Sequence, residues 1–439
     1  LVAWDGSHYR FISDMIGAGV VGHWVGENER NIPDPTEYLK VDGSIVKQKN
    51  GLLSFRFMEP MEEVVYIDQL RLLAVDHPAG YNVEPNEYFA ANPPYPEFKV
   101  IGSNLRDLRL PAGAWDDHGR NVLPLLEKRD REYVDGFKLL RNYAGYTEPH
   151  SLTLDLGEPY EGGTLRLLLH GFIEYFTATS MFSAHQAGID PVAPYVEAEV
   201  NGRWVKVVDD MGFPAGLPRT TVADLTGRLP VGTRRIRVGT NLQIYWDQVL
   251  IDRTPSSPVV TLNEVPLASA RLAFHGYPLD RERGKNVPGD HYYTYEIVSP
   301  TGPYVRQAGA YTRLGDVTKL VSTSDDRFAV FGSGDAIKLD FDPSKLPALP
   351  KGWTRDYFFF ADGFEKDMDF YAADGLTVDP LPFHAMGTYP YPASRTYWRD
   401  AQHVDTVLDM NTRFYGDVPP KDFRYHYPNA AGKRTIQKN

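Results

Sequence analysis

The sequence predicts a large all-β protein built from several antiparallel β-sandwiches of the jelly-roll type. Three observations indicate this. Short apolar runs alternate with polar residues and end at Gly or Pro, the chain holds 27 Tyr and 22 Phe, and it has no Cys in 439 residues. Aromatic residues are enriched in strands, and Gly and Pro mark the turns between them. Because a chain of this length exceeds a single core, we expect two to four domains.

The first predicted unit is an N-terminal β domain over residues 1–115. Residues 52–57 alternate with period two, as a half-buried strand does. Residues 64–75 form a longer apolar run, and the turn residues at 76–80 terminate it. A Pro-rich passage at 92–96 then leads to a boundary near residue 115.

The second predicted unit is a jelly-roll-like sandwich over residues 116–254. Its clearest feature is a hairpin in which strands at 195–200 and 204–208 flank Asn201-Gly202, a pair suited to a type I′ turn. Further strands are predicted at 152–157, 164–169, 234–238 and 244–251. We expect one face of these strands to be buried, with the side chains of Val196, Val200, Ile236 and Val238 in the core.

The third predicted unit is a C-terminal sandwich over residues 258–379, which follows a linker at 254–258 rich in Pro and Ser. Its strands are predicted at 271–274, 328–331, 337–341 and 357–360. Residues 380–439 complete the chain with a Pro-rich arm at 380–392, a short helix within 402–415 and an extended tail over 429–439. The arm either packs on its own domain or clasps a neighbouring subunit.

Charge and composition limit the partners. With 58 acidic and 46 basic residues the formal net charge is −12, which opposes binding to nucleic acid phosphates and to anionic membrane surfaces. No apolar run reaches the length of about 18–20 residues that a membrane-spanning helix needs. The absence of Cys excludes disulfides and thiolate metal sites. The Tyr-rich β composition and a first residue other than Met favour an exported protein, extracellular or at the cell surface, with the periplasm as an alternative.

Familiar catalytic motifs are not supported. Residues 17–22 match G-x-G-x-x-G, but Pro33 and Pro35 prevent the long helix that a dinucleotide site needs, so we expect a loop that binds no nucleotide. The 12 His show no metal-hydrolase spacing and no G-x-S-x-G is present, so no catalytic residue is named. A glycosidase stays open, because its two carboxylates can come from distant positions.

Acidic pairs suggest one cofactor, a structural calcium ion. They occur at Asp209–Asp210 and Asp325–Asp326, and a further cluster combines Asp362 with Asp367 and Asp369. Calcium takes six to eight oxygen ligands, usually from carboxylates and carbonyls of a loop. We name Asp209 and Asp210 as candidate calcium ligands, with solvated turn carboxylates as the alternative. No other cofactor is expected.

A second group of residues has the character of a sugar-binding site. Sugar-binding sites place flat aromatic rings against C–H faces and use amide or carboxylate groups for hydroxyls. The alternative is that these rings simply fill the core. The candidate ligand-binding residues are Glu174, Tyr175, His185, Gln186, Trp204, Tyr245, Trp246 and Asp247.

The order of several short motifs carries a family resemblance. They are Ala-Trp-Asp-Gly at 3–6 with Tyr-Arg-Phe at 9–11, the run Tyr-Ile-Asp-Gln-Leu-Arg-Leu-Leu-Ala-Val-Asp-His-Pro at 66–78, and the stretches at 209–216, 241–247 and 380–392. The chain resembles the C-terminal region of bacterial exported proteins that carry FG-GAP (VCBS-type) repeats, relatives of cartilage acidic protein that often include an ASPIC/UnbV segment. The resemblance implies export and an adhesive or assembly role. Neither propeller repeats nor an ASPIC/UnbV segment occurs here, so the calcium loops of that family do not carry over.

Together these observations predict a non-catalytic, exported binding or assembly protein. Its expected partner is a protein, which is either another copy of this chain or a neighbouring surface protein. A glycan is the other possible partner. The alternative is a carbohydrate-active enzyme or its glycan-binding accessory module.

Overall fold

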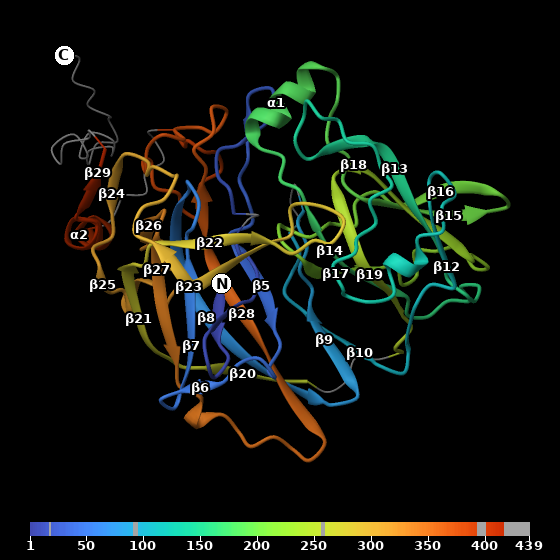
Figure 1. Cartoon of the computed structure of the whole chain (residues 1–439), viewed down its shortest axis with the longest axis horizontal. Helices are drawn as coiled ribbons and strands as arrows, with labels where there is room; N and C mark the ends of the chain where they lie inside the picture. The colour runs from blue at the N-terminus through green and yellow to red at the C-terminus, as the bar shows by residue number, and fades with distance from the viewer. Residues whose placement is uncertain (17–18, 91–94, 256–259, 393–400, 417–439) are drawn as a thin grey trace.

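The computed structural model describes residues 1–16, 19–90, 95–255, 260–392 and 401–416. It confirms the all-β class, since the described residues form antiparallel sheets and two short α-helices, α1 (Ala178–Gln186) and α2 (Ala401–Met410). The sheets form two lobes that lie side by side in Figure 1, and a long hairpin crosses from one lobe towards the other. Helix α2 overlaps the predicted helical stretch at 402–415 and begins one residue before it. The predicted tail at 429–439 lies outside the described residues.

The first sandwich combines the two ends of the chain, so blue and orange strands alternate in the left lobe of Figure 1. One sheet has the order β2-β1-β7-β27-β21-β25 with β6 on β7, and the other has the order β20-β8-β28-β5 with β26 on β8. The first sheet contains β1 (Val2–Trp4), β2 (Tyr9–Phe11), β6 (Gln48–Lys49), β7 (Leu52–Met58), β21 (Leu267–Phe274), β25 (Gly315–Asp316) and β27 (Asp335–Phe341). The second contains β5 (Thr36–Val41), β8 (Val64–Pro78), β20 (Thr261–Val265), β26 (Ala329–Gly332) and β28 (Trp353–Lys366).

This pairing differs from the predicted division into separate units at 1–115 and 258–379. Strand β7 pairs with β27, and β8 pairs with β28 along almost their whole length. The physical reason is that alternation marks which residues are buried in a strand but not which strand lies beside it. The two segments bury their apolar faces against each other in one core, which includes Phe55, Ile67, Phe331 and Phe359.

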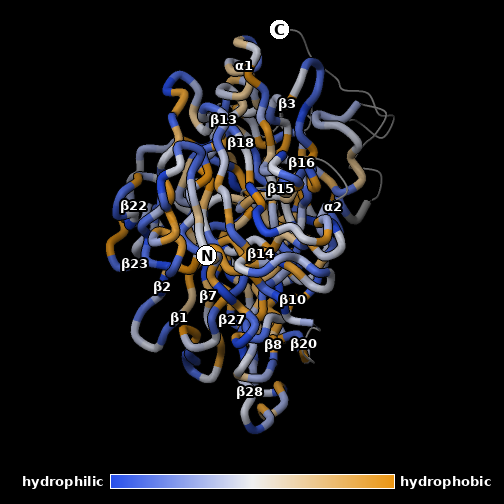
Figure 2. The backbone as a smooth tube through the Cα atoms, turned by 90° about the vertical axis from the view of Figure 1, so that its right-hand side faces the viewer, coloured by the Kyte–Doolittle hydropathy of each residue, from blue (hydrophilic) through white to orange (hydrophobic). Residues whose placement is uncertain are grey.

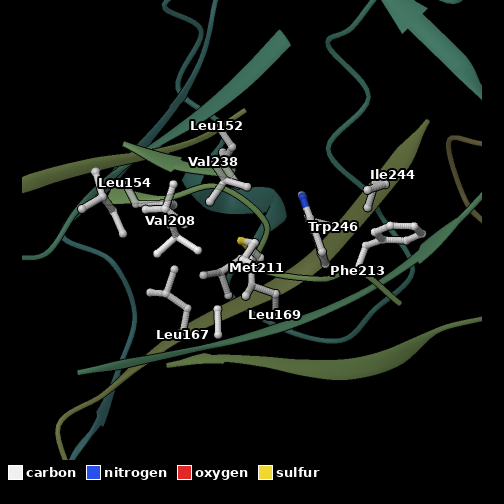
Figure 3. Close-up of a cluster of buried hydrophobic side chains, with 14 of the residues drawn as sticks. Leu152, Leu154, Leu167, Leu169, Val208, Met211, Phe213, Val238, Ile244 and Trp246 are labelled. Atoms are coloured by element: carbon white, nitrogen blue, oxygen red, sulfur yellow. The ribbon is translucent and has the colours of Figure 1, made fainter. Parts of the chain in front are cut away.

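The second sandwich is formed by the middle of the chain. Its sheets have the orders β11-β19-β14-β17 and β12-β13-β18-β15-β16. The strands are β11 (Leu108–Arg109), β12 (Gly113–Asp116), β13 (Tyr146–Asp155), β14 (Arg166–Ile173), β15 (Tyr195–Val200), β16 (Arg203–Val208), β17 (Arg219–Asp224), β18 (Arg235–Leu242) and β19 (Ile244–Asp252). Leucines from β13 and β14 meet Val238 and Trp246 between the sheets (Figure 3).

The predicted details of this sandwich are largely confirmed. Val196, Ile236 and Val238 are buried, whereas Val200 is only partly buried because it lies where β15 ends at the turn. Asn201 and Gly202 have φ angles of 51° and 74°, as a type I′ turn requires.

Smaller elements complete the chain. Two-stranded sheets pair β3 (Trp24–Gly26) with β4 (Glu29–Arg30), β9 (Tyr81–Pro85) with β10 (Val100–Asn104), β22 (Tyr277–Glu282) with β23 (His291–Ser299), and β24 (Gly309–Tyr311) with β29 (Arg413–Tyr415). Short 3-10 helices cover Leu123–Leu125, Thr318–Leu320 and Pro343–Lys345. Hydrophobic stretches along the tube in Figure 2 are short and alternate with hydrophilic ones. Among the described residues, no helix is long and apolar enough to cross a membrane.

The Pro-rich arm packs on its own chain. Leu381, Met386, Tyr389 and Tyr391 are buried in a cluster with side chains of β8, β26 and β28. The Tyr389 hydroxyl donates a hydrogen bond to the carbonyl oxygen of Pro380. Of the two alternatives for this segment, the structure therefore shows packing within the chain.

Candidate functional site

A β-bulge places one carboxylate out of register in the long strand pair of the first sandwich. Strand β8 has 15 residues and β28 has 14. Asp362 pairs with Gln69 and Gly363 with Ile67, so Asp68 has no opposite residue. A Cβ on Gly363 would approach the carbonyl oxygen of Tyr66 to 2.3 Å, so the bulge requires glycine here. A bulge redirects a side chain, and bulges are common beside functional sites.

The Asp68 carboxylate is fully buried and only half satisfied. Its Oδ2 accepts hydrogen bonds from the backbone N–H groups of Asp325 and Asp326, both at 2.8 Å. Its Oδ1 has no hydrogen-bond partner. Burial raises the pKa of Asp68 to about 7, against the lowering effect of the two N–H groups. A buried polar atom without a partner is costly, so its retention calls for an explanation.

His384, from the Pro-rich arm, connects the other carboxylates. Its Nδ1 lies 2.6 Å from Asp326 Oδ1 and 3.7 Å from Asp68 Oδ2, and its Nε2 lies 2.8 Å from Asp362 Oδ1. The ring is flanked by Phe328 and Phe364. Burial lowers the pKa of His384, but the hydrogen bonds to Asp326 and Asp362 outweigh it and raise the pKa to about 10.

We call Asp68, Asp326, Asp362 and His384 the Asp–His centre. Three carboxylates face one imidazolium, so negative charge is in excess. One ligand atom each from Asp68, Asp326 and His384 lies within 4.8 Å of the others, which is close enough to hold a metal ion.

Sequence reasoning found parts of the Asp–His centre but not the whole. Asp326 and Asp362 belong to the acidic clusters of the sequence, whereas the spacing of the 12 His does not single out His384. Asp68 was not recognised as a candidate. The available signal was that Asp68 lies in the mainly apolar run at 64–75, directly after four apolar residues, where a carboxylate is unexpected. These four residues, which lie far apart in the sequence, come together only because of the strand pairing.

The predicted calcium ligands lie elsewhere. Asp209 and Asp210 are both exposed, and Asp210 Oδ1 accepts the backbone N–H of Gly212 within a turn. They are not part of the group that brings metal-ligand atoms together.

The predicted sugar-binding residues do not form one surface. Tyr245 and Trp246 are buried, and the Trp246 indole lies among the core side chains in Figure 3. Asp247 is also buried and accepts hydrogen bonds from the backbone N–H groups of Asp130 and Arg131. For these three residues the structure therefore favours the alternative that they fill the core.

The remaining predicted residues occupy separate elements. His185 and Gln186 end helix α1, where His185 Nδ1 lies 2.6 Å from an Asp190 carboxylate oxygen. Trp204 lies on the edge strand β16, and the Arg237 guanidinium stacks over its ring. Burial raises the pKa of Glu174.

Tyr175, which is 41% exposed, contacts an ion-pair network that joins the two sandwiches. Its hydroxyl donates to Asp14 Oδ2 at 3.0 Å. Arg219, on β17, makes ion pairs with Asp14 and with Glu37 on β5. Because Arg219 and Glu37 are buried, this network is expected to contribute to the fixed contact between the lobes.

The second sandwich also has one small pocket, with a volume of about 20 Å³. Such a volume admits about one water molecule. Its lining includes Asp117, Phe137, His150, Thr240 and Trp246.

Comparisons with known proteins add little. No family model matches the chain, and no curated protein is similar to it. A solved structure described as CpGH89CBM32-6 produced by Clostridium perfringens is 16% identical, with a TM-score of 0.18, and the match covers 34% of this chain and 94% of that chain. A structure of infectious bursal disease virus, Gx strain, is 8% identical over 80% of this chain and 74% of that chain, with a TM-score of 0.10. Neither likeness is close enough to assign an activity, and the resemblance to FG-GAP-associated proteins stays a prediction.

Proposed function

We propose that this chain is a binding protein that holds a cation at the Asp–His centre and acts by binding rather than by turnover. The single observation that supports this is the Oδ1 atom of Asp68, which is buried, carries no hydrogen bond and belongs to a carboxylate that faces His384. A cation bound there would satisfy this atom and offset the excess negative charge of the centre.

The cation would also join segments that are far apart in the sequence. Asp68 lies on β8, Asp326 precedes β26, Asp362 lies on β28 and His384 belongs to the arm. A ligand that binds only the folded chain stabilises it by about 2.7 kcal/mol at one hundred times its Kd. Cation binding is therefore expected to strengthen the attachment of the arm.

Thermal unfolding tests this proposal. The full chain, treated with chelator, is titrated with Ca²⁺, Mg²⁺, Mn²⁺ and Zn²⁺ in turn. We expect at least one cation to raise the midpoint in the wild type and not in Asp68→Asn, which keeps the side-chain shape. The double variant Asp209→Asn/Asp210→Asn is the control and should respond like the wild type. If no cation changes the wild-type midpoint, or if the control alone loses the response, the proposal fails.

The enzyme alternative has its own outcome. Two of the carboxylates, Asp68 and Asp362, lie on neighbouring strands, and acid–base catalysis of glycoside hydrolysis needs such a pair. Release of reducing sugar from a polysaccharide by the wild type, and its loss in Asp68→Asn, would replace the binding proposal with a hydrolase.

Glycan binding is a second candidate, favoured by the pocket of the second sandwich. Its lining sets the Phe137 ring beside His150, and the two ring centroids are 4.5 Å apart. A pocket of this size admits a single hydroxyl group, so a sugar ring would have to lie across its mouth on Phe137. Binding to a glycan array that is lost in Phe137→Ala would support this candidate, and an array without signal would contradict it.

We also propose an exported location and a protein partner, which the family resemblance and the composition support. The crossing hairpin β22–β23 and the segment after it expose apolar side chains, with Ile297 58% and Val305 67% accessible. Such side chains favour association through this surface. Light scattering of the wild type and of Ile297→Ser/Val305→Ser tests it, since a wild type that stays monomeric at all concentrations would contradict self-association.

A further inference from the structure

We infer that the cation of the Asp–His centre is a divalent transition-metal ion of the Zn²⁺ class, bound by Asp68, Asp326 and Nδ1 of His384. This inference rests on the proposed function and narrows it to one class of ion. It concerns a site built from four segments of the chain and does not involve the predicted calcium ligands.

The donor set selects the ion. Ca²⁺ and Mg²⁺ are hard cations that take oxygen ligands, whereas imidazole nitrogen is a preferred ligand of Zn²⁺ and its neighbours in the first transition row. In the Asp–His centre, Nδ1 of His384 lies 2.6 Å from an oxygen of Asp326 and 3.7 Å from an oxygen of Asp68. An ion between these three groups would therefore contact nitrogen as well as oxygen.

The spacing is close to what a tetrahedral ion needs. With metal–ligand bonds of about 2.0–2.1 Å, neighbouring ligand atoms of a tetrahedral site lie about 3.3 Å apart. The 2.6 Å between Nδ1 and Asp326 Oδ1 is below this value, and the 3.7 Å between Nδ1 and Asp68 is measured to Oδ2, whereas one ligand atom from each of the three residues lies within 4.8 Å of the others. The ion would widen the spacing between Nδ1 and Asp326 by about 0.7 Å and take the place of the proton between them. That proton leaves to the solvent.

Asp68 has an oxygen available for the metal. Oδ2 is held by two backbone N–H groups, and these fix the orientation of the carboxylate. Oδ1 has no partner and belongs to a side chain that is fully buried. One oxygen can therefore bind the ion while the other stays on the backbone, so no existing hydrogen bond of Asp68 has to break.

Asp362 completes the arrangement as a positioning residue. Its Oδ1 lies 2.8 Å from Nε2 of His384, and the side chain is buried. Metal-binding histidines usually donate their second ring N–H to a carboxylate, which fixes the tautomer and the ring orientation. With Nε2–H directed to Asp362, the lone pair of Nδ1 is directed to Asp326 and Asp68.

The Asp–His centre is partly accessible to solvent. The side chains of His384 and Asp326 are 30% and 27% exposed. Zinc sites with three protein ligands keep the fourth position for water or an exogenous ligand, as catalytic zinc sites do, whereas structural zinc sites are closed by four protein ligands. The ion is therefore expected to exchange and to be removable by a chelator without unfolding the chain.

Equilibrium dialysis of the chelator-treated full chain against Zn²⁺ tests this inference, with Ca²⁺ as the comparison ion. The variants are Asp68→Asn, His384→Gln and Asp362→Asn, and the control is His291→Gln, which removes a partly buried histidine that pairs with Asp280 outside the centre. Circular dichroism checks that each variant is folded. We expect one Zn²⁺ per wild-type chain and per control chain. The affinity for Zn²⁺ should fall 10–100-fold in Asp362→Asn, and at least as much in Asp68→Asn and His384→Gln.

A second readout separates nitrogen from oxygen coordination. With ring-¹⁵N histidine in the chain, Zn²⁺ should shift one Nδ1 resonance, and that resonance should be missing in His384→Gln. Saturable Zn²⁺ binding that is equal in His384→Gln and the wild type would overturn the inference. Binding of Ca²⁺ but not of Zn²⁺, lost in Asp68→Asn, would overturn it and leave the proposed function standing. If neither ion binds, both fail.

Discussion

Replacement of Arg219 tests whether the buried ion pairs fix the contact between the two sandwiches. In Arg219→Met an apolar side chain of similar length replaces the guanidinium, which removes its ion pairs with Asp14 and Glu37. The Glu37 carboxylate would then keep one hydrogen bond among those that the structure shows, from the backbone N–H of Ile16.

The expected cost follows from burial. The side chains of Arg219 and Glu37 are each 5% exposed, so water cannot replace the lost partner. Loss of one member of a buried pair typically costs about 3–5 kcal/mol. Addition of Glu37→Gln removes the unpaired charge and should recover about 1–3 kcal/mol of this loss. Arg235→Met is the matched control, because Arg235 is exposed and pairs with Glu199 at the surface, where a pair contributes about 0–1 kcal/mol.

The free energy of unfolding is measured in urea by linear extrapolation for the wild type, the two single variants and the double variant. We expect the free energy of unfolding to fall strongly in Arg219→Met, to recover in part in the double variant and to change little in Arg235→Met. If Arg219→Met and Arg235→Met lose the same small amount, the network does not stabilise the contact.

Three further predictions concern the core, the pH dependence and the arm. Ile236→Ala should cost about 2–5 kcal/mol because Ile236 is fully buried, whereas Val205→Ala, 47% exposed on β16, should change the urea midpoint little; equal effects would contradict the assigned core. Burial, with contributions from Glu62 and Asp367, raises the pKa of Glu59 to about 8. The folded state therefore retains a proton that the unfolded state has lost between about pH 4.5 and 8, so stability falls as pH rises through this window. Glu59→Gln should flatten that fall in urea titrations at pH 5 and 8, and an unchanged slope would refute it. Truncation after Asp379 should lower the thermal midpoint because it exposes the cluster around Tyr389, and a truncated chain as stable as the wild type would show that the arm does not contribute.

The sequence predicted local structure well and long-range pairing poorly. The alternation in 195–208 and the Asn201-Gly202 turn were enough to locate a hairpin, because residue pattern and turn chemistry are both local. The pairing of β8 with β28 joins residues nearly 300 positions apart, and nothing in either strand specifies its neighbour. The Asp–His centre depends on that pairing and on a bulge, so its parts were visible in the sequence and their meeting was not.

The aromatic residues show a second limit of sequence reasoning. Tyr245, Trp246 and Asp247 have the composition of a ligand site, but a strand directs alternate side chains to opposite faces, and both faces of β19 are covered here. Composition alone cannot show which faces of a strand are covered. Asp68 carries the clearer signal in retrospect, because a charge within an apolar run must be satisfied by a partner or an ion.

The most direct test of the central claim is anomalous diffraction at the zinc absorption edge from crystals of the full chain grown with Zn²⁺. We predict an anomalous peak in contact with Asp68, Asp326 and Nδ1 of His384, with Nε2 of His384 still hydrogen-bonded to Asp362. Crystals that contain zinc at other positions, with no peak at this centre and the His384 ring still between Asp326 and Asp362, would contradict the account.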